Sequence, residues 1–306
     1  MKEITGYIRG YIYETDRRIL FIITVFTGFL VWANYRFGID DSISRDAGFL
    51  LPFLSRSGIF LLAFSIPYLI YTALAGKKYF REKGFVTLLL IAPLVFSFKV
   101  AFNPYFSFSD DWQTDHFWNY ITYWPVLLLI TTAALTLIRN RFDKGQPLYG
   151  IKTKNINWTP YIMMLLIMLP LVVAASTQPD FLEVYPKLIS ATATGNIDSL
   201  RWWQKLLFEL SYGSDFITIE LFFRGFLVIA FVKWAGKDAI LPMACFYCTI
   251  HFGKPIGECI SSYFGGMILG IVVYHTRSIY GGLMVHLGIA WMMEIGGYIG
   301  NFTPIP

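Results

Sequence analysis

The stretch Asp215–Gly225, D-F-I-T-I-E-L-F-F-R-G, places a carboxylate and a guanidinium inside an apolar run that extends from Leu206 to Trp234. Charged side chains are costly in hydrocarbon, and those found within a membrane segment usually serve a function. Glu220 and Arg224 are four residues apart with the acid first, so on an α-helix they share one face and can pair. Two interpretations are open at this point: a structural ion pair that fixes this helix against a neighbour, or part of a functional site.

The composition of the 306-residue chain is that of a membrane protein. Hydrophobic residues make up 56% and charged residues only 15%. Several apolar runs reach the roughly 17–25 residues that a helix needs to cross a bilayer, and a helix satisfies its own backbone groups in lipid. We therefore predict an all-α, polytopic integral membrane bundle of about eight to nine transmembrane helices. The predicted spans lie near residues 19–35, 57–75, 85–102, 118–138, 159–176, 207–234, 238–252, 258–276 and 279–299.

The distribution of Lys and Arg predicts the orientation of the chain. The net charge of +5 does not indicate a nucleic-acid partner, because the basic residues lie in short loops between the apolar runs. When the spans are laid out in order, most basic loop residues fall on the side of the N-terminus. Since cytoplasmic loops are enriched in Lys and Arg, we expect a cytoplasmic N-terminus. The opposite side holds only Arg36, Arg45, Arg56, Lys187, Arg201, Lys205 and Lys254.

Three more ionisable side chains lie in the late apolar runs, namely His251, His286 and Glu294, although the whole chain has only four histidines. Two histidines and a carboxylate on three helices suit either metal ligation or acid–base chemistry. A lone intramembrane histidine can equally be a hydrogen-bonded contact between helices. Spacing alone leaves these alternatives open.

The three cysteines do not indicate a disulfide framework, because Cys245, Cys248 and Cys259 lie in or beside apolar runs. The sequence C-F-Y-C-T-I-H, which ends at His251, carries ligand types that zinc prefers. Positions i, i+3 and i+6, however, drift around a helix by about 120°. We therefore predict that these cysteines are packing residues.

Three short motifs follow one another within about eighty residues. They are E-L-F-F-R-G from Glu220, Tyr247 four residues before His251, and G-G-M-I-L-G…Y-H-T-R-S-I-Y-G-G-L-M-V-H, which ends at His286. This order resembles the CPBP intramembrane proteases, whose pattern is E-E-x-x-x-R, then F-x-x-x-H, then H-x-x-x-N/D on successive helices. The family includes CAAX-processing endopeptidases and bacterial Abi or bacteriocin self-immunity proteins. The resemblance covers residues 205–293 and implies a membrane protease of metallo- or glutamic type, which we expect in a bacterial inner membrane.

Carried over position by position, the resemblance assigns the second Glu to Glu220, the arginine to Arg224, and the histidines to His251 and His286. Two positions depart from the pattern. Ile219 stands in place of the first Glu, and Ala290 stands in place of the Asn or Asp. The family's base and one of its water-holding groups are therefore absent.

Two other carboxylates could substitute for the missing groups. Asp215 precedes Ile219 by four residues and Glu294 follows Ala290 by four, so each shares a helix face with the family position one turn away. This spacing suggests a site rebuilt around Asp215, His251 and Glu294. The alternative is that Asp215 caps its span and Glu294 faces a polar end.

Three functions follow from these observations. The first is an intramembrane endopeptidase that uses Glu220, His251 and His286, with Asp215 or Glu294 as substitute base, on a membrane-protein or peptide substrate. The second is a catalytically inactive relative that binds membrane proteins as a scaffold or partner subunit. A transporter or proton path lined by the same groups is the third. Besides membrane lipid, a divalent metal such as zinc is a possible ligand, held by His251, His286 and Glu220. We place the domain boundary in the loop 139–158, giving an N-terminal region 1–150 without motifs and a CPBP-like region 151–306.

Overall fold

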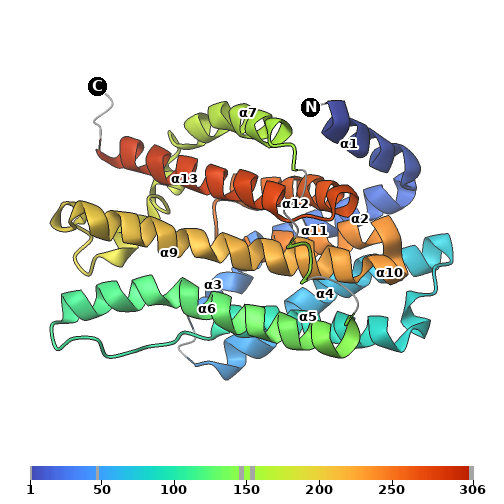
Figure 1. Cartoon of the computed structure of the whole chain (residues 1–306), viewed down its shortest axis with the longest axis horizontal. Helices are drawn as coiled ribbons and strands as arrows, with labels where there is room; N and C mark the ends of the chain where they lie inside the picture. Colours follow the sequence, from blue (N-terminus) through green and yellow to red (C-terminus); the bar gives the residue numbers. More distant parts are fainter. Residues whose placement is uncertain (1, 46–47, 145–147, 152–155, 303–306) are drawn as a thin grey trace. The chain divides into compact units, whose positions relative to one another are not determined.

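The computed structural model describes residues 2–45, 48–144, 148–151 and 156–302, and every regular element within them is helical (Figure 1). The predicted all-α class is confirmed. Six of the described helices are long and apolar enough to cross a membrane, so the protein is an integral membrane protein. These six are α2 (Arg17–Phe37), α4 (Leu50–Ala75), α5 (Lys83–Ala101), α6 (Trp112–Phe142), α12 (Ile256–Thr276) and α13 (Tyr280–Phe302).

A bent segment raises this number to seven at most among the described residues. Helix α7 (Thr159–Ala175) and the chain that follows it, residues 179–191, meet at 100°, the geometry of a broken span or of a re-entrant loop. The bent part holds α8 (Pro179–Leu182) and the 3-10 helix η2 (Lys187–Ala191). The remaining short elements are α1 (Lys2–Glu14), α3 (Ile39–Ser44), η1 (Tyr79–Arg81) and η3 (Ile197–Ser199).

Two predicted spans, 207–234 and 238–252, are not single long helices. The first is divided among α9 (Trp202–Glu220), a π-helix η4 (Leu221–Ala230) and the short α10 (Val232–Ala235). After η5 (Gly236–Ala239), helix α11 (Ile240–Thr249) has ten residues, which is about half the length needed to cross a bilayer. Hydropathy predicted these spans because it registers apolar length and is insensitive to breaks within an apolar run.

The described chain forms two compact units that interleave in sequence. The first unit comprises Met1–Phe102, Ala134–Thr153 and Leu221–Ile279, and the second comprises Asn103–Ala133, Lys154–Glu220 and Tyr280–Pro306. Each unit draws on both halves of the chain. Residues 145–147 and 152–155 of the predicted linker lie outside the described residues.

In the first unit, helix α11 packs against α2, α4 and α12. Every side chain of α11 is buried, as expected for a short apolar helix enclosed by longer ones. Two glycines on one face of α12 permit the close approach. A Cβ on Gly266 would lie 2.8 Å from Cδ1 of Tyr247, and a Cβ on Gly270 would lie 2.5 Å from Cε of Met243. Two glycines four residues apart therefore let Tyr247 and Met243 of α11 pack directly against the backbone of α12.

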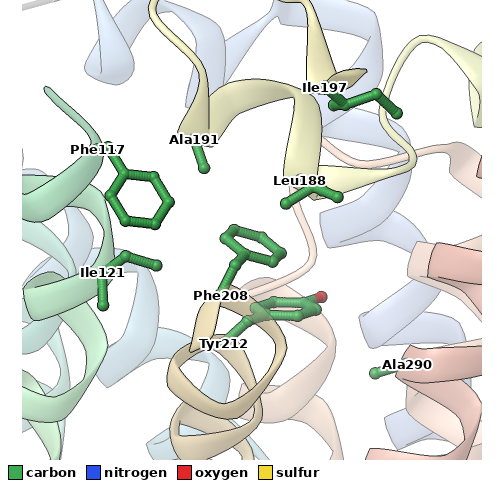
Figure 2. Packing of buried hydrophobic residues seen from close by; sticks show 8 residues of the cluster. All are labelled: Phe117, Ile121, Leu188, Ala191, Ile197, Phe208, Tyr212 and Ala290. Atoms are coloured by element: carbon green, nitrogen blue, oxygen red, sulfur yellow. The ribbon is translucent and has the colours of Figure 1, made fainter. Parts of the chain in front are cut away.

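In the second unit, α13 packs against α7 and α9. Figure 2 shows the buried cluster of this unit, in which the rings of Phe208 and Tyr212 on α9 lie next to each other. The aromatic face of α9 at positions 208, 212 and 216 follows the helical repeat, so one side of the helix is committed to the interior. The same repeat continues one turn further to Glu220. The cluster consists of Phe117, Ile121, Leu188, Ala191, Ile197, Phe208, Tyr212 and Ala290.

Candidate active site

A histidine and a carboxylate from two helices of the second unit meet directly. Nδ1 of His286 lies 3.1 Å from Oε1 of Glu220, which is the last residue of α9. The Glu220 side chain is fully buried, while the His286 side chain retains 16% exposure. An ionised carboxylate only accepts hydrogen bonds, so Nδ1 donates and Nε2 of the neutral ring keeps its lone pair. The pair therefore has the geometry of a carboxylate-oriented general base.

Two residues that the motifs do not assign hold this pair in place. Gly282 lies one turn before His286 on α13, and a Cβ at that position would lie 2.5 Å from Oε2 of Glu220. The carboxylate thus occupies space that any larger residue at position 282 would fill. Phe216, one turn before Glu220 on α9, packs against the His286 imidazole, with ring centroids 4.7 Å apart and an angle of 67° between the ring planes. Gly282 thus leaves room for the Glu220 carboxylate, and Phe216 packs against the His286 ring.

Tyr247 connects the other two motif residues within the first unit. The guanidinium of Arg224 lies over the Tyr247 ring, 4.1 Å from its centroid, and both side chains are buried. The ring of His251 packs edge-on against the same tyrosine at 4.7 Å. Nδ1 of His251 lies 3.0 Å from the carbonyl oxygen of Tyr247. Because a carbonyl only accepts, Nδ1 carries the hydrogen and Nε2 keeps the lone pair when the ring is neutral.

A π-helix removes the basis for placing Glu220 and Arg224 on one helix face. The argument that residues four apart share a face assumes 3.6 residues per turn. The chain is π-helical from Leu221 to Ala230, so that spacing does not predict which side chains face one another. Such i→i+5 segments are rare and are frequent at functional sites. Here the segment begins at the residue after Glu220 and contains Arg224.

The substitute carboxylates occupy different settings. Glu294 accepts hydrogen bonds from the backbone N–H groups of Lys187 at 2.8 Å and Leu188 at 3.3 Å. It thereby caps the N-terminal end of η2, where backbone donors lack partners within the helix. Asp215 lies half-buried on α9, one turn before the buried Ile219. This geometry favours a structural role for Glu294.

The two positions that depart from the family pattern are apolar and buried. Ile219 is 6% exposed and Ala290 is 5% exposed. Ala290 belongs to the aromatic cluster around Tyr212, as Figure 2 shows. A polar side chain in that cluster would need a hydrogen-bond partner to offset its burial. The surroundings of position 290 are therefore adapted to the alanine.

The metal-ligand set expected from the sequence, His251, His286 and Glu220, draws on both units, and the Glu220–His286 pair meets within the second. In the part of the chain that the structure describes, no group of three or more His, Cys, Asp or Glu residues could hold a metal ion. The Glu220–His286 pair offers two ligands. Cys245, Cys248 and Cys259 are free and buried, and Sγ of Cys248 lies 4.0 Å from Sγ of Cys259.

Sequence reasoning named Glu220, Arg224, His251 and His286, and the structure gives each of them a buried or half-buried setting with a specific partner. It missed Gly282 and Phe216. Phe216 could have been found as the residue one turn before Glu220 on the same helix face. Gly282 had a weaker signal, a glycine one turn before a motif histidine, because glycine pairs are common in membrane helices.

Comparisons with known proteins bear on the segment that contains these residues. Residues 202–292 match the family described as type II CAAX prenyl endopeptidase Rce1-like. No curated protein and no solved structure matches the chain. The matched segment begins with α9 and ends within α13, so it contains both members of the Glu220–His286 pair together with Arg224 and His251. Over residues 202–292 the chain is therefore similar to the CAAX protease family, the resemblance that the three motifs indicated.

Proposed function

We propose that this protein is an intramembrane endopeptidase that hydrolyses peptide bonds with Glu220 and His286 as its general-base pair. The observation that carries the proposal is the 3.1 Å contact between the buried carboxylate and the partly exposed imidazole. A buried charge is retained where it has a hydrogen-bonded partner and a task. The family match over residues 202–292 supports peptide-bond hydrolysis as that task.

The chemistry follows from the direction of the hydrogen bond. Nε2 of His286 removes a proton from water while Glu220 stabilises the imidazolium through Nδ1. The resulting hydroxide attacks the scissile carbonyl, and the imidazolium then returns the proton to the leaving amine. We propose His251 as a second polar residue of the reaction, with Nε2 of its neutral ring as a hydrogen-bond acceptor, since its Nδ1 donates to the Tyr247 carbonyl. Arg224 is the positioning residue that holds the Tyr247 ring.

The test is a cleavage assay with the purified protein in lipid nanodiscs. The substrate is a synthetic peptide that ends in a prenylated CAAX sequence, the class that the family's name gives. We expect a cleaved product, and we expect Glu220→Gln and His286→Ala each to slow cleavage about 10²–10⁴-fold. The double variant should be little slower than either single variant, because the two groups act as a unit.

Matched controls are the exposed Glu183→Gln and His275→Ala, which should cleave like the parent. Full-rate cleavage by a folded Glu220→Gln variant would exclude the proposed base. Absence of product from the parent, with this peptide and with a mixed membrane-peptide pool, would exclude the peptidase.

A second candidate function is a catalytically inactive scaffold. It is favoured by one specific observation: Ile219 and Ala290 are buried apolar residues at positions where the family has acids or an amide. Under this alternative, crosslinking in the native membrane captures a partner protein, and the Glu220→Gln variant captures the same partner to the same extent. The cleavage assay and the crosslinking assay have separate readouts, so they distinguish the two functions.

For its location we propose a bacterial inner membrane with the N-terminus in the cytoplasm. The excess of Lys and Arg on the N-terminal side supports the orientation. Contacts of the first unit agree with the predicted grouping of the loops, because residues predicted on the same side pair with one another. Lys237 lies 2.7 Å from Glu14, and on the other side Tyr35 donates to the carbonyl of Lys254. A membrane-impermeant maleimide added to intact cells should label Ser42→Cys, and should label Glu14→Cys only after permeabilisation. The reverse pattern would overturn the orientation.

A further inference from the structure

An elongated groove runs between α2 and α12 in the first unit. Its volume is about 570 Å³, which lies within the range of small-molecule sites. The two helices are antiparallel here, since Thr24 contacts the hydroxyl of Tyr263 at 3.1 Å, while Tyr35 reaches the carbonyl of Lys254, just before α12. The lining residues are Thr24, Thr27, Gly28, Val31, Trp32, Tyr35, Arg36, Cys248, Ile256, Ile260, Tyr263 and Phe264.

The groove follows the membrane-spanning direction. On α2 its lining extends from Thr24 to Arg36, which is about 18 Å of helix at 1.5 Å per residue. Its outer edges are apolar and exposed, with Trp32 54%, Ile256 50% and Phe264 46% exposed. Both helices qualify as membrane spans, so these edges face lipid. A linear apolar chain fits such a groove along its length.

One end of the groove carries a cation. Arg36 lies in the last turn of α2 and is exposed. Within the described ranges its guanidinium forms no ion pair. Trp32 and Tyr35 line the same groove, and such aromatic rings concentrate at the level of lipid headgroups. A guanidinium at this level matches the geometry and charge of a phosphate.

We propose that this groove binds one membrane phospholipid, with an acyl chain along α2 and α12 and the phosphate on Arg36. The charge at one end and the apolar walls behind it require a ligand with an anionic head and a hydrocarbon tail. A neutral apolar molecule would satisfy the walls and leave the guanidinium without its anion. The lining residues include neither Glu220 nor His286, so this site is separate from the proposed base pair.

The structure offers a substitution that fills the groove without disturbing its walls. A Cβ on Gly28 meets no heavy atom within 4 Å, so Gly28→Leu can project its side chain into the groove. Gly58 on α4 is equally open and lies outside the groove, which makes Gly58→Leu the matched control. Arg36→Gln removes the charge, and Arg45→Gln removes an exposed arginine outside the groove.

The experiment is native mass spectrometry of the full-length protein, titrated with phosphatidylglycerol or with diacylglycerol of the same chains. We expect a one-lipid phosphatidylglycerol complex that is about tenfold weaker in Arg36→Gln, since a charge-assisted bond is lost. Gly28→Leu should weaken it by at least as much, while both controls should bind like the parent. Diacylglycerol should bind the parent as weakly as phosphatidylglycerol binds Arg36→Gln.

Equal affinity of the parent for the two lipids would overturn the proposal, since the phosphate would then contribute nothing. Undiminished binding by Gly28→Leu would also overturn it, because the lipid would lie elsewhere. Arg36 is exposed at a helix end, so Arg36→Gln gives a readout even if a larger residue at position 28 impairs folding. Both outcomes are independent of the cleavage assay.

Discussion

A methyl group on residue 282 would lie 2.5 Å from Oε2 of Glu220, so glycine at this position creates the space in which the carboxylate is held. The same helix presents His286 one turn later, at 3.1 Å from the other carboxylate oxygen. Gly282 and His286, four residues apart on α13, therefore form the binding position for the Glu220 carboxylate of α9. The geometry of the pair depends on the absence of a side chain as much as on the side chains present.

We predict that Gly282→Ala disables the pair while the helices stay assembled. The added methyl must displace the carboxylate, and a misplacement of about 1 Å can cost about 10²-fold in rate. Cleavage in nanodiscs should fall by about that factor, with KM changed less than kcat. Gly265→Ala on α12, where a Cβ meets nothing within 4 Å, is the matched control and should retain the parental rate. Parental activity in Gly282→Ala would show that Glu220 need not stay at this position.

The Tyr247 ring gives a second prediction, because it supports both Arg224 and His251. Tyr247→Leu removes the surface under the buried guanidinium, and a desolvated cation–π contact is worth about 2 kcal/mol. Tyr247→Phe keeps the aromatic ring, and phenylalanine is the residue type of the family motif. This variant should lose less than half as much free energy of unfolding as Tyr247→Leu. Thermal unfolding in detergent micelles measures both variants. If the two variants unfold alike, the ring does not support Arg224.

The sequence predicted the class of the protein and the segment that carries the site for a simple physical reason. Long apolar runs must become helices in lipid, and an ionisable residue within them stands out against that background. Glu220 and His286 were both found in this way, although 66 residues separate them in the chain. Their direct contact was not predicted, since helix spacing paired Glu220 with Arg224 and no property of either residue alone indicates the contact with His286.

Other features depend on contacts that one sequence does not encode visibly. The π-helix that begins at Leu221 has no composition different from that of an α-helix, so α-helical spacing was assumed for Arg224. The partner of Glu294 is the backbone of Lys187, 107 residues away, and a backbone amide leaves no signature in a sequence. The short α11 was predicted as a span because its apolar run continues beyond the helix itself.

The capping contact of Glu294 gives a third prediction. Glu294→Ala leaves the two N–H groups at the start of η2 without their acceptor, and loss of a helix cap costs about 1–2 kcal/mol. We expect a lower unfolding midpoint and a rate of cleavage that falls less than in Glu220→Gln. The exposed Glu183→Ala is the control for loss of a carboxylate. A loss of rate equal to that of Glu220→Gln, at unchanged stability, would instead make Glu294 a catalytic residue.

A fourth prediction concerns Tyr79, which lies outside the spans and donates a hydrogen bond of 2.6 Å to the buried carboxylate of Asp238. Lys77 lies 3.3 Å from the same oxygen. Tyr79→Phe deprives that carboxylate of one donor, which costs about 1–3 kcal/mol at neutral pH. The exposed Tyr13→Phe should leave stability unchanged.

The pH dependence of the same contact has a definite sign. Burial, followed by the hydrogen bond to Asp238 and its negative charge, raises the pKa of Tyr79 above its ordinary value of 10.0. A raised pKa means that the folded state holds the proton more tightly, so the stabilisation is complete below pH 10. It is lost as the pH rises beyond that value through the folded-state pKa. The difference in unfolding midpoint between parent and Tyr79→Phe should therefore be largest at pH 8 and smaller at about pH 11, where an ordinary tyrosine is ionised. A difference that grows on going to alkaline pH would contradict the assigned hydrogen bond, because it would require the folded state to favour the phenolate.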